Sequence, residues 1–219
     1  KLGKDTFANI ALDTMKELGM DASRVIQTED HATGVALIEV DENSGQNAIM
    51  VIPSACDHIA DEEVAALKDL VEGADILLTQ LETNMSSIKA IVDMAHAAGK
   101  TIILNTAPVQ PVEPELLAKV SIVTPNEVEA SILTGVKVVD AQSAQKAADW
   151  FFGHGVQSVV ITMGGMGAFV SDGKRSELTP AFKVNAVDTT GAGDAYNGGF
   201  VTALSEGNDI FAAARFAAA

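Results

Sequence analysis

Cysteine is nearly absent from this chain of 219 residues, because Cys56 is the only one. A single cysteine excludes a disulfide framework and a zinc site built from cysteine thiolates. The same scarcity is compatible with the reducing environment of the cytoplasm. No apolar run is long enough to cross a bilayer, and residues 1–5 lack the apolar core of a signal peptide. We therefore expect a cytoplasmic protein with no membrane partner.

Positive charge is scarce as well. The chain has 14 lysine and arginine residues against 30 aspartate and glutamate residues, which gives a net charge of -16. A chain this acidic repels the phosphates of nucleic acids and of anionic lipids, so we expect no nucleic-acid partner. An anionic substrate would need a local device, such as a metal ion or the N-terminus of a helix.

Short apolar segments that alternate with helical patterns are the main structural signal. Hydrophobic residues make up 47% of the chain, which is enough for a core. Strands are predicted over 75–79, 101–105, 121–124 and 159–162, and helices over 7–18, 113–119, 127–134 and 142–152, with two more that Asp61 and Asn84 cap. This alternation predicts an α/β fold with a mostly parallel central sheet and helices on both faces.

Two further apolar segments break the alternation. They span residues 33–41 and 48–52, and Asn43–Gly45 between them is typical of a turn. The pair predicts a β-hairpin that projects as a small appendage from the α/β body.

Polar residues follow several of the predicted strands at the point where each strand ends. They are Gln80, Glu82, Asn105, Thr106, Asn126, Thr162 and Gly164. Ligands of parallel sheets bind beyond the carboxyl ends of the strands. Several such groups at one rim predict a binding site, although each alone is also typical of a loop or a helix cap.

The segment Asp188–Asp194, with the sequence DTTGAGD, carries the clearest chemical signal. Gly191 and Gly193 precede a predicted helix, whose first free N–H groups would form an anion hole. Asp194 lies in the first helical turn, where it could accept a proton from an attacking hydroxyl group. The alternative is that Asp194 only favours the helix dipole and that the glycines serve packing. A Walker P-loop and a G-x-G-x-x-G dinucleotide motif are absent from the sequence.

This segment resembles the D-T-x-G-A-G-D signature of the ribokinase-like (PfkB) carbohydrate kinases. Asn126–Glu129 resembles the magnesium motif N-x-x-E of that family, and Thr162–Gly167 resembles its nucleotide loop T-x-G-x-x-G. Residues 33–38, 80–82 and 105–108 resemble the ribose-specific members. The resemblance implies ATP-dependent phosphorylation of a sugar hydroxyl group, with D-ribose converted to D-ribose 5-phosphate.

The resemblance also implies a role for each matched residue. Asp194 would be the catalytic base and would touch the sugar, Gly191, Ala192 and Gly193 would form the anion hole, and Glu82 would bind ribose. Asn126, Thr162, Gly164 and Gly167 would bind ATP, Glu129 would order Mg²⁺ through water, and Asp188 and Thr190 would hold K⁺. Residues 27–54 would form part of a β lid on a body made of residues 1–26 and 55–219. In many relatives this lid pairs two subunits, so a homodimer is expected.

Some parts of the family pattern are not in the sequence. Its N-x-D and G-G-K-G-A-N sugar-binding motifs would precede Lys1, and its last strand and helix would follow Ala219. We therefore expect both ends to be truncated and this piece to be poorly active by itself. Residues 53–57 also differ from the usual P-G-A-N run. Fructokinase, ketodeoxygluconate kinase, nucleoside kinase and a non-catalytic sugar or nucleotide sensor remain alternatives.

Overall fold

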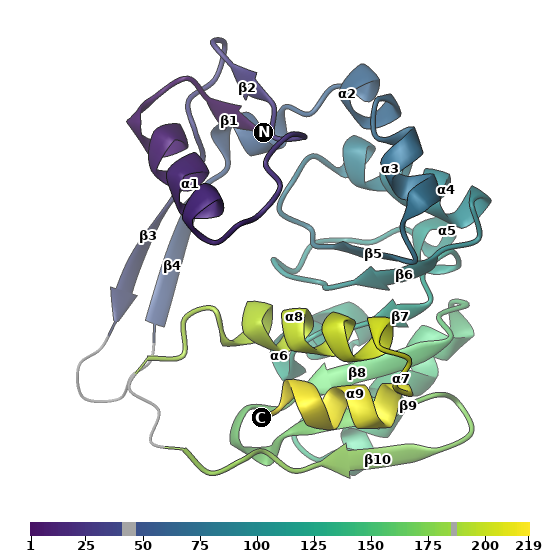
Figure 1. Cartoon of the computed structure of the whole chain (residues 1–219). Helices are drawn as coiled ribbons and strands as arrows, with labels where there is room; N and C mark the ends of the chain where they lie inside the picture. The colour runs from purple at the N-terminus through teal and green to yellow at the C-terminus, as the bar shows by residue number, and fades with distance from the viewer. Residues whose placement is uncertain (41–46, 185–187) are drawn as a thin grey trace.

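A six-stranded sheet forms the centre of the computed structural model, which describes residues 1–40, 47–184 and 188–219 (Figure 1). The strands are β5 (Ile76–Thr79), β6 (Thr101–Leu104), β7 (Ile122–Val123), β8 (Ser158–Thr162), β9 (Ala168–Ser171) and β10 (Ser176–Thr179), in the order β10-β9-β8-β7-β6-β5. The pairs from β5 to β8 are parallel, and those from β8 to β10 are antiparallel. The predicted mostly parallel sheet is confirmed, with β9 and β10 as an additional antiparallel edge.

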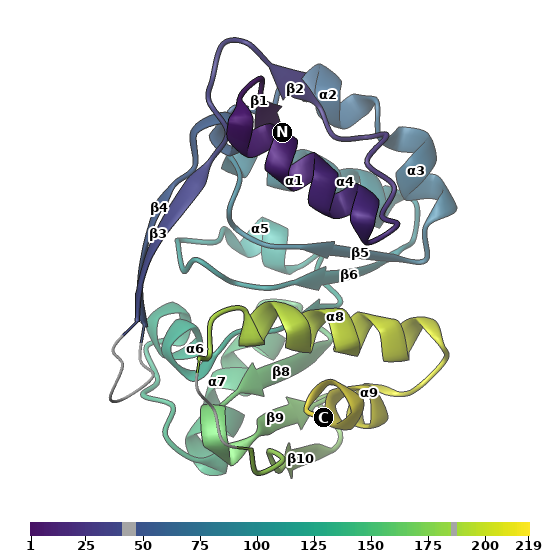
Figure 2. The same ribbon diagram turned by 60° about the vertical axis from the view of Figure 1, so that its left-hand side comes forward.

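Helices cover both faces of this sheet, as predicted. One face carries α3 (Lys68–Gly73), α4 (Met85–Ala97), α5 (Pro114–Leu117), α6 (Glu127–Thr134) and α7 (Ala141–Gly153), and the other carries α8 (Ala192–Ser205) and α9 (Ile210–Ala217) (Figures 1 and 2). The period of two along β6 divides its side chains between the faces. Ile102 and Leu104 pack in the core with Phe151 of α7, and Ile103 packs with Phe200 of α8. Within the described residues, no helix has the length and apolar character that a membrane span requires.

The helix predicted to begin at Asp61 is in fact two short helices. Helix α2 covers Asp61–Ala65, and α3 begins only at Lys68. Asp61 is the first helical residue and not the cap, because the N-cap position belongs to Ala60. The backbone N–H of Ala60 donates to Glu63 Oε2 at 2.8 Å. A side chain from inside the helix thus supplies the hydrogen-bond partner of the N-cap residue.

Asn84 stands at the N-cap of α4, as predicted, but its side chain does not cap that helix. The Asn84 amide group instead bonds the backbone of Ile59 in both directions, at 3.1 Å to the N–H and 3.0 Å to the carbonyl oxygen. It therefore fixes the chain before α2 to the start of α4.

The N-terminal residues and the predicted appendage are connected through hydrogen bonds. Strand β1 (Leu2–Gly3) pairs in parallel with β2 (Gln27–Thr28), and the first predicted helix is α1 (Thr6–Glu17). The boundary expected between residues 26 and 27 therefore separates two paired strands. Strands β3 (Val35–Val40) and β4 (Asn47–Ile52) form the predicted antiparallel pair, and the short helix η1 (Ser54–Asp57) follows. The turn predicted at Asn43–Gly45 lies outside the described residues.

The pair β3–β4 carries apolar side chains that the rest of this chain leaves uncovered. Leu37 and Met50, which face each other in the register, are 61% and 64% exposed. Both views show the pair on the side of the molecule where α8 begins (Figures 1 and 2). It thus projects beside the edge of the sheet that carries the predicted site.

Asp5 ties helix α1 to the segment that leads into β3. Its carboxylate accepts from the amide of Thr33 at 2.7 Å, from the amide of Ala8 at 2.9 Å and from the Thr33 hydroxyl at 2.8 Å. These bonds, the Thr33 amide first, lower the pKa of Asp5 below its usual value.

We expect Asp5→Ala to lower the melting temperature at pH 7, because it removes a helix cap and a bond between two segments. The pKa of Asp5 is lowered in the folded state, so its stabilisation is present above the usual pKa and is lost as the pH falls through the lowered value. Asp13→Ala, an exposed change on the same helix, is the control. Thermal melts from pH 7 to pH 3 measure both variants. An equal loss for Asp5→Ala at every pH would contradict this account.

Candidate active site

At the carboxyl edge of the sheet, predicted site residues from two distant segments of the sequence lie together. Gln80 and Glu82 follow β5, and Asp194 lies in the first turn of α8. Gln80 Nε2 donates to Asp194 Oδ1 at 2.8 Å, although the two residues are 114 positions apart in the sequence. The parallel sheet accounts for this meeting, because it places the end of β5 beside the beginning of the helix that crosses its face.

Glu82 lies in the electrostatic field of Asp194. Partial burial of its carboxyl group, and then the negative charge of Asp194, raise the pKa of Glu82 above the usual glutamate value. The repulsion between these two carboxylates destabilises the folded state, so folding by itself does not account for the pair. Such a pair is typical of a site that binds hydroxyl groups or moves a proton.

The start of α8 has two features that the predicted anion hole would need, a positive φ at Gly191 and open space at Gly193. Gly191 is the N-cap, with φ at +74°, a left-handed conformation that glycine adopts without strain. Gly193 is open, because a Cβ atom added there would meet nothing within 4 Å. The Ala192 amide donates to the Thr189 carbonyl oxygen at 3.1 Å. In this arrangement the Ala192 N–H belongs to the turn before the helix.

The two residues predicted to hold a monovalent cation are exposed and close together. Asp188 Oδ1 accepts from the Thr190 amide at 2.8 Å. This bond, and then the Thr190 side chain, lower the pKa of Asp188. Both residues therefore offer oxygen atoms within one tight turn, next to the undescribed residues 185–187.

Two of the predicted nucleotide-binding residues are neighbours in space. Asn126 and Thr162 form an isolated parallel bridge, and the Thr162 amide donates to the Pro125 carbonyl oxygen at 3.0 Å. Gly164, with φ at +51°, begins the short helix η2 (Gly164–Met166), with one residue between it and the end of β8. Asn126, Thr162 and Gly164 thus lie around the ends of β7 and β8.

Gly167 has a structural reason to be glycine. Its φ is +103°, and a Cβ atom there would lie 1.9 Å from the Thr179 carbonyl oxygen. This residue begins the β9–β10 hairpin against the backbone of β10. Gly164 differs, because a Cβ atom there would meet only the Glu127 carboxylate, at 3.9 Å.

We expect Gly167→Ala to destabilise the fold by about 3 kcal/mol or more, because overpacking adds about 1–3 kcal/mol and a positive φ adds about 1–2 kcal/mol. Gly164→Ala has the φ penalty alone, so its loss is about 1–2 kcal/mol. Urea unfolding at equal protein concentration measures both. Equal stability losses would show that the backbone contact of Gly167 does not restrict the residue there.

Glu129 is buried, with 8% of its surface exposed, and its carboxylate is held from three directions. Oε2 accepts from the Thr106 hydroxyl at 2.9 Å and from the Asn126 amide at 3.1 Å, and Oε1 accepts from Asn126 Nδ2 at 2.8 Å. Asn126 in turn caps α6 through the amides of Val128 and Glu129. Because both oxygens already accept hydrogen bonds, this carboxylate fits a magnesium ion that keeps its water ligands between them.

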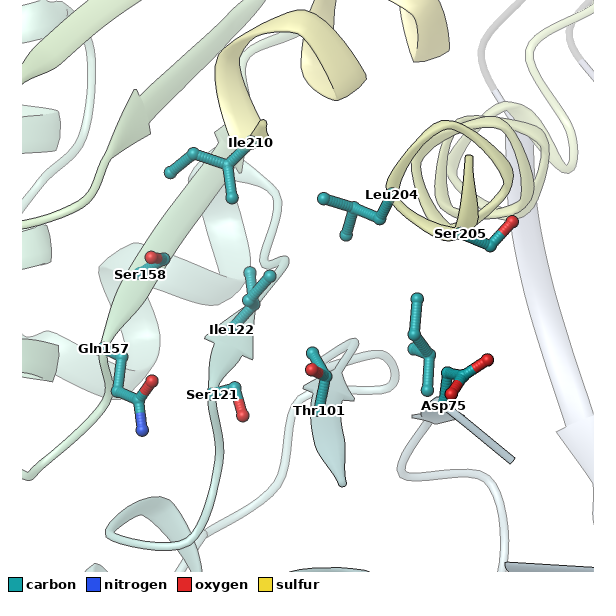
Figure 3. A pocket seen from close by; sticks show the side chains of 10 residues that line it. Asp75, Thr101, Ser121, Ile122, Gln157, Ser158, Leu204, Ser205 and Ile210 are labelled. Atoms are coloured by element: carbon teal, nitrogen blue, oxygen red, sulfur yellow. The ribbon is translucent and has the colours of Figure 1, made fainter. Parts of the chain in front are cut away.

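Among the described residues, no group of three or more His, Cys, Asp or Glu side chains could hold a metal ion directly. The pocket in Figure 3, of about 400 Å³, contains none of the predicted site residues. It is lined by residues at the amino-terminal ends of β5, β6, β7 and β8, including Asp75, Thr101, Ser121 and Ser158. Ligands of parallel sheets bind at the opposite edge, where the motif residues lie, so the carboxyl edge is the candidate active site.

The sequence did not single out Asn197 and Thr124, which are buried behind the start of α8. Asn197 Nδ2 donates to the Gly193 carbonyl oxygen at 2.9 Å, and its Oδ1 accepts from the Thr124 hydroxyl at 2.7 Å. Asn197 is 6% exposed and interrupts an otherwise apolar helix face. That position was the one available signal, because a buried amide needs a polar partner.

Known proteins resemble this chain over nearly its whole length. The sequence profile described as pfkB family carbohydrate kinase matches residues 1–219. The ribokinase of Haemophilus influenzae is 40% identical over 215 residues, which covers 98% of this chain and 70% of that protein. A ribokinase structure from Thermotoga maritima has a TM-score of 0.86 at 30% identity and covers 99% of this chain and 70% of that chain. A ribokinase structure from Arabidopsis thaliana, in complex with ribose and ATP, has a TM-score of 0.87 at 27% identity, with coverages of 99% and 71%.

Proposed function

Because this chain belongs to the pfkB family of carbohydrate kinases, we propose that it transfers the γ-phosphoryl group of ATP to the 5-hydroxyl group of D-ribose. The products are D-ribose 5-phosphate and ADP. The contact between Gln80 and Asp194 carries this proposal, since it joins the predicted base to the predicted sugar-binding strand end. Ribose is favoured because the relatives named above are ribokinases.

In this mechanism Asp194 accepts the proton of the 5-hydroxyl group. The oxygen forms a bond to the γ-phosphorus while the bond from that phosphorus to the departing ADP oxygen breaks. Gln80 orients the Asp194 carboxylate by donating to Oδ1, and the carboxylate keeps lone pairs that can accept the proton. Gly191, Ala192 and Gly193 at the start of α8 stabilise the charge on the transferring group. The Ala192 N–H takes part once it leaves its turn partner, Thr189.

ATP lies along the ends of β7 and β8 in this proposal. Asn126, Thr162, Gly164 and Gly167 line its site, and Glu129 faces the divalent metal through water. When bound, the metal neutralises charge on the ATP phosphates. The capping contacts of Asn126 and the Thr106 hydroxyl keep the Glu129 carboxylate in one orientation.

We further propose K⁺ as the activating cation, at the turn of Asp188 and Thr190. Their oxygen atoms are the donor type that a hard monovalent ion requires, and the turn directly precedes Gly191. The cation would therefore support the charge and the conformation of the anion hole.

Residues 27–54 act as part of a lid in this proposal, and the protein is cytoplasmic. The exposed apolar side chains of β3 and β4 support a homodimer formed through the lid. Closing the lid would exclude water from the phosphoryl group and limit ATP hydrolysis.

Glu82→Gln is expected to raise KM for D-ribose by about 10- to 100-fold, because hydrogen bonds to charged groups contribute about 1.5–3 kcal/mol. It is also expected to raise the melting temperature at neutral pH. The pKa of Glu82 is raised in the folded state, so its stabilisation is present at low pH and is lost as the pH rises through that value. Glu206→Gln, exposed at the other end of α8, is the control. An unchanged KM would remove Glu82 from the sugar site.

The substrate assignment is tested by ADP release from the full-length protein with Mg²⁺ and K⁺. The panel is D-ribose, deoxyribose, fructose, ketodeoxygluconate and adenosine, and the expected result is the highest kcat/KM with D-ribose. A higher value with fructose, ketodeoxygluconate or adenosine would assign the protein to that kinase activity instead. ATP binding without turnover on any of them would favour a sensor.

A further inference from the structure

Two buried hydrogen-bond chains begin at adjacent residues where β6 ends. Asn105 and Thr106 follow Leu104, the last residue of that strand, and they are 8% and 0% exposed. The chain from Asn105 leads to α8, which carries the proposed base. The chain from Thr106 leads to α6, which carries the proposed metal-facing carboxylate.

The first chain has a single direction of donation. Asn105 Nδ2 donates to the Thr124 carbonyl oxygen at 2.7 Å and to the Thr124 hydroxyl oxygen at 3.3 Å. The Thr124 hydroxyl then donates to Asn197 Oδ1, and Asn197 Nδ2 donates to the Gly193 carbonyl oxygen. The chain ends one residue before Asp194. It therefore fixes the height of the α8 N-terminus above the end of β7.

The second chain is shorter. The Thr106 hydroxyl donates to Glu129 Oε2 at 2.9 Å, beside the amide of Asn126 on the same oxygen. Thr106 is the one contact of this carboxylate that comes from outside the Asn126–Glu129 segment among its hydrogen bonds in the described part of the chain. It therefore ties α6 to the end of β6, independently of the capping box.

Buried hydroxyl groups of this kind favour one arrangement of their partners, because a buried donor or acceptor left without a partner destabilises the folded state. The two chains start at adjacent residues, Asn105 and Thr106. The end of β6 therefore sets two distances from itself. One is the distance to the proposed anion hole, and the other is the distance to the proposed metal-facing group. Phosphoryl transfer depends on the relative placement of those two sites.

We propose that Thr124 and Thr106 are positioning residues of the kinase site, an inference that rests on the proposed function. Thr124 holds Gly193 and, through it, Asp194 in place for transfer. Thr106 holds Glu129 in the orientation that favours the hydrated metal. The two residues act on different steps, and each is tested by an isosteric change that removes only the hydroxyl group.

Thr106→Val is expected to raise the Mg²⁺ concentration for half-maximal ATP binding by about 10-fold, the effect typical of losing a partner of a metal-facing group. Its kcat at saturating Mg²⁺ stays within about threefold of the parent. Calorimetric titration of ATP at several Mg²⁺ concentrations provides a readout besides turnover. Thr106→Ser, which keeps the hydroxyl group, restores the parent value.

Thr124→Val is expected to lower kcat by about 10- to 100-fold, because small misplacements of a reacting group are costly. Its Mg²⁺ requirement stays within twofold of the parent, and amide hydrogen exchange of residues 191–195 becomes faster. Thr124→Ser is the matched control and stays close to the parent. The four variants together give a double dissociation that general destabilisation would not produce.

Two results would overturn the inference. One is an equal change of kcat and of Mg²⁺ requirement in both valine variants, and the other is no change in either. If the parent binds ATP with Mg²⁺ but phosphorylates no sugar, the proposed function fails. The Mg²⁺ titration of Thr106→Val and the hydrogen exchange of Thr124→Val then still decide the positioning roles.

Discussion

Asp194→Asn is expected to lower kcat with D-ribose by about 10²- to 10⁴-fold, the contribution typical of a general base. Asparagine has nearly the same shape, and its carbonyl oxygen can still accept the bond from Gln80 Nε2. The helix start therefore stays intact while the proton acceptor is lost. KM for ATP is expected to change by less than about threefold, since the substitution leaves the ends of β7 and β8 unchanged. Steady-state kinetics of the full-length protein measure both constants.

Asp209→Asn is the matched control for a role at the helix dipole. Asp209 caps α9 by accepting from the amides of Phe211 and Ala212, at 3.0 Å and 2.8 Å. It is the same residue type at the start of a neighbouring helix, with a structural task alone. Similar small losses of activity in both variants would mean that Asp194 serves the helix and not the chemistry.

Gly193→Ala is expected to lower kcat by about 10²-fold without loss of stability. A Cβ atom at Gly193 meets nothing within 4 Å apart from its chain neighbours and the nearby backbone of its own helix, so the folded chain has room for it. The methyl group would instead occupy the space above the helix start, where the phosphoryl group must approach the N–H donors. Losing alignment with one such donor costs about 10²- to 10³-fold in comparable anion holes. Stability stays the same or rises by up to about 1 kcal/mol, because alanine favours helix over glycine.

Gly198→Ala provides the comparison on the same helix. Gly198 is exposed, lies inside α8, and also has open space at its Cβ position. The gain in helix propensity is expected there as well, but kcat is expected to stay at the parent value. Paired urea unfolding and kinetics separate the two effects. A fully active Gly193→Ala variant would contradict the proposed anion hole.

The parts of the fold that follow a simple periodic pattern could be predicted from the sequence. Strands β5 to β8 are short apolar runs between helical patterns, and α6 was predicted with its observed bounds, Glu127–Thr134. The hairpin β9–β10 was not predicted. Its strand Ser176–Thr179 is half polar, and its register depends on the tight contact of Gly167 with Thr179. That contact joins residues that no local pattern connects.

The split between α2 and α3 also has a physical reason outside the local pattern. Val64, Leu67 and Leu70 recur at a helical spacing, which predicted one helix, but Leu70 is 52% exposed. The chain leaves the helical path at Ala66–Leu67, and both pieces pack on α4. Packing on another helix thus decided where this segment bends.

The site was predicted as a set of residues but not as a set of contacts. The motifs named Asp194, Asn126, Glu129 and Thr162, and the structure brings Asn126 beside both Glu129 and Thr162. The bond from Gln80 to Asp194 and the buried chain through Asn197 depend on how the strands are ordered in the sheet. Sequence spacing does not contain that information. The division into body and lid, and the residue roles, stay predictions.

The most direct test of the proposed function is to identify the product made from ATP and D-ribose. The full-length protein would be incubated with both substrates, Mg²⁺ and K⁺, and the phosphorus-containing products followed by ³¹P NMR. We predict equal amounts of ADP and D-ribose 5-phosphate, with little inorganic phosphate. Phosphate on another hydroxyl group, ADP with inorganic phosphate alone, or bound but unreacted ATP would contradict the account.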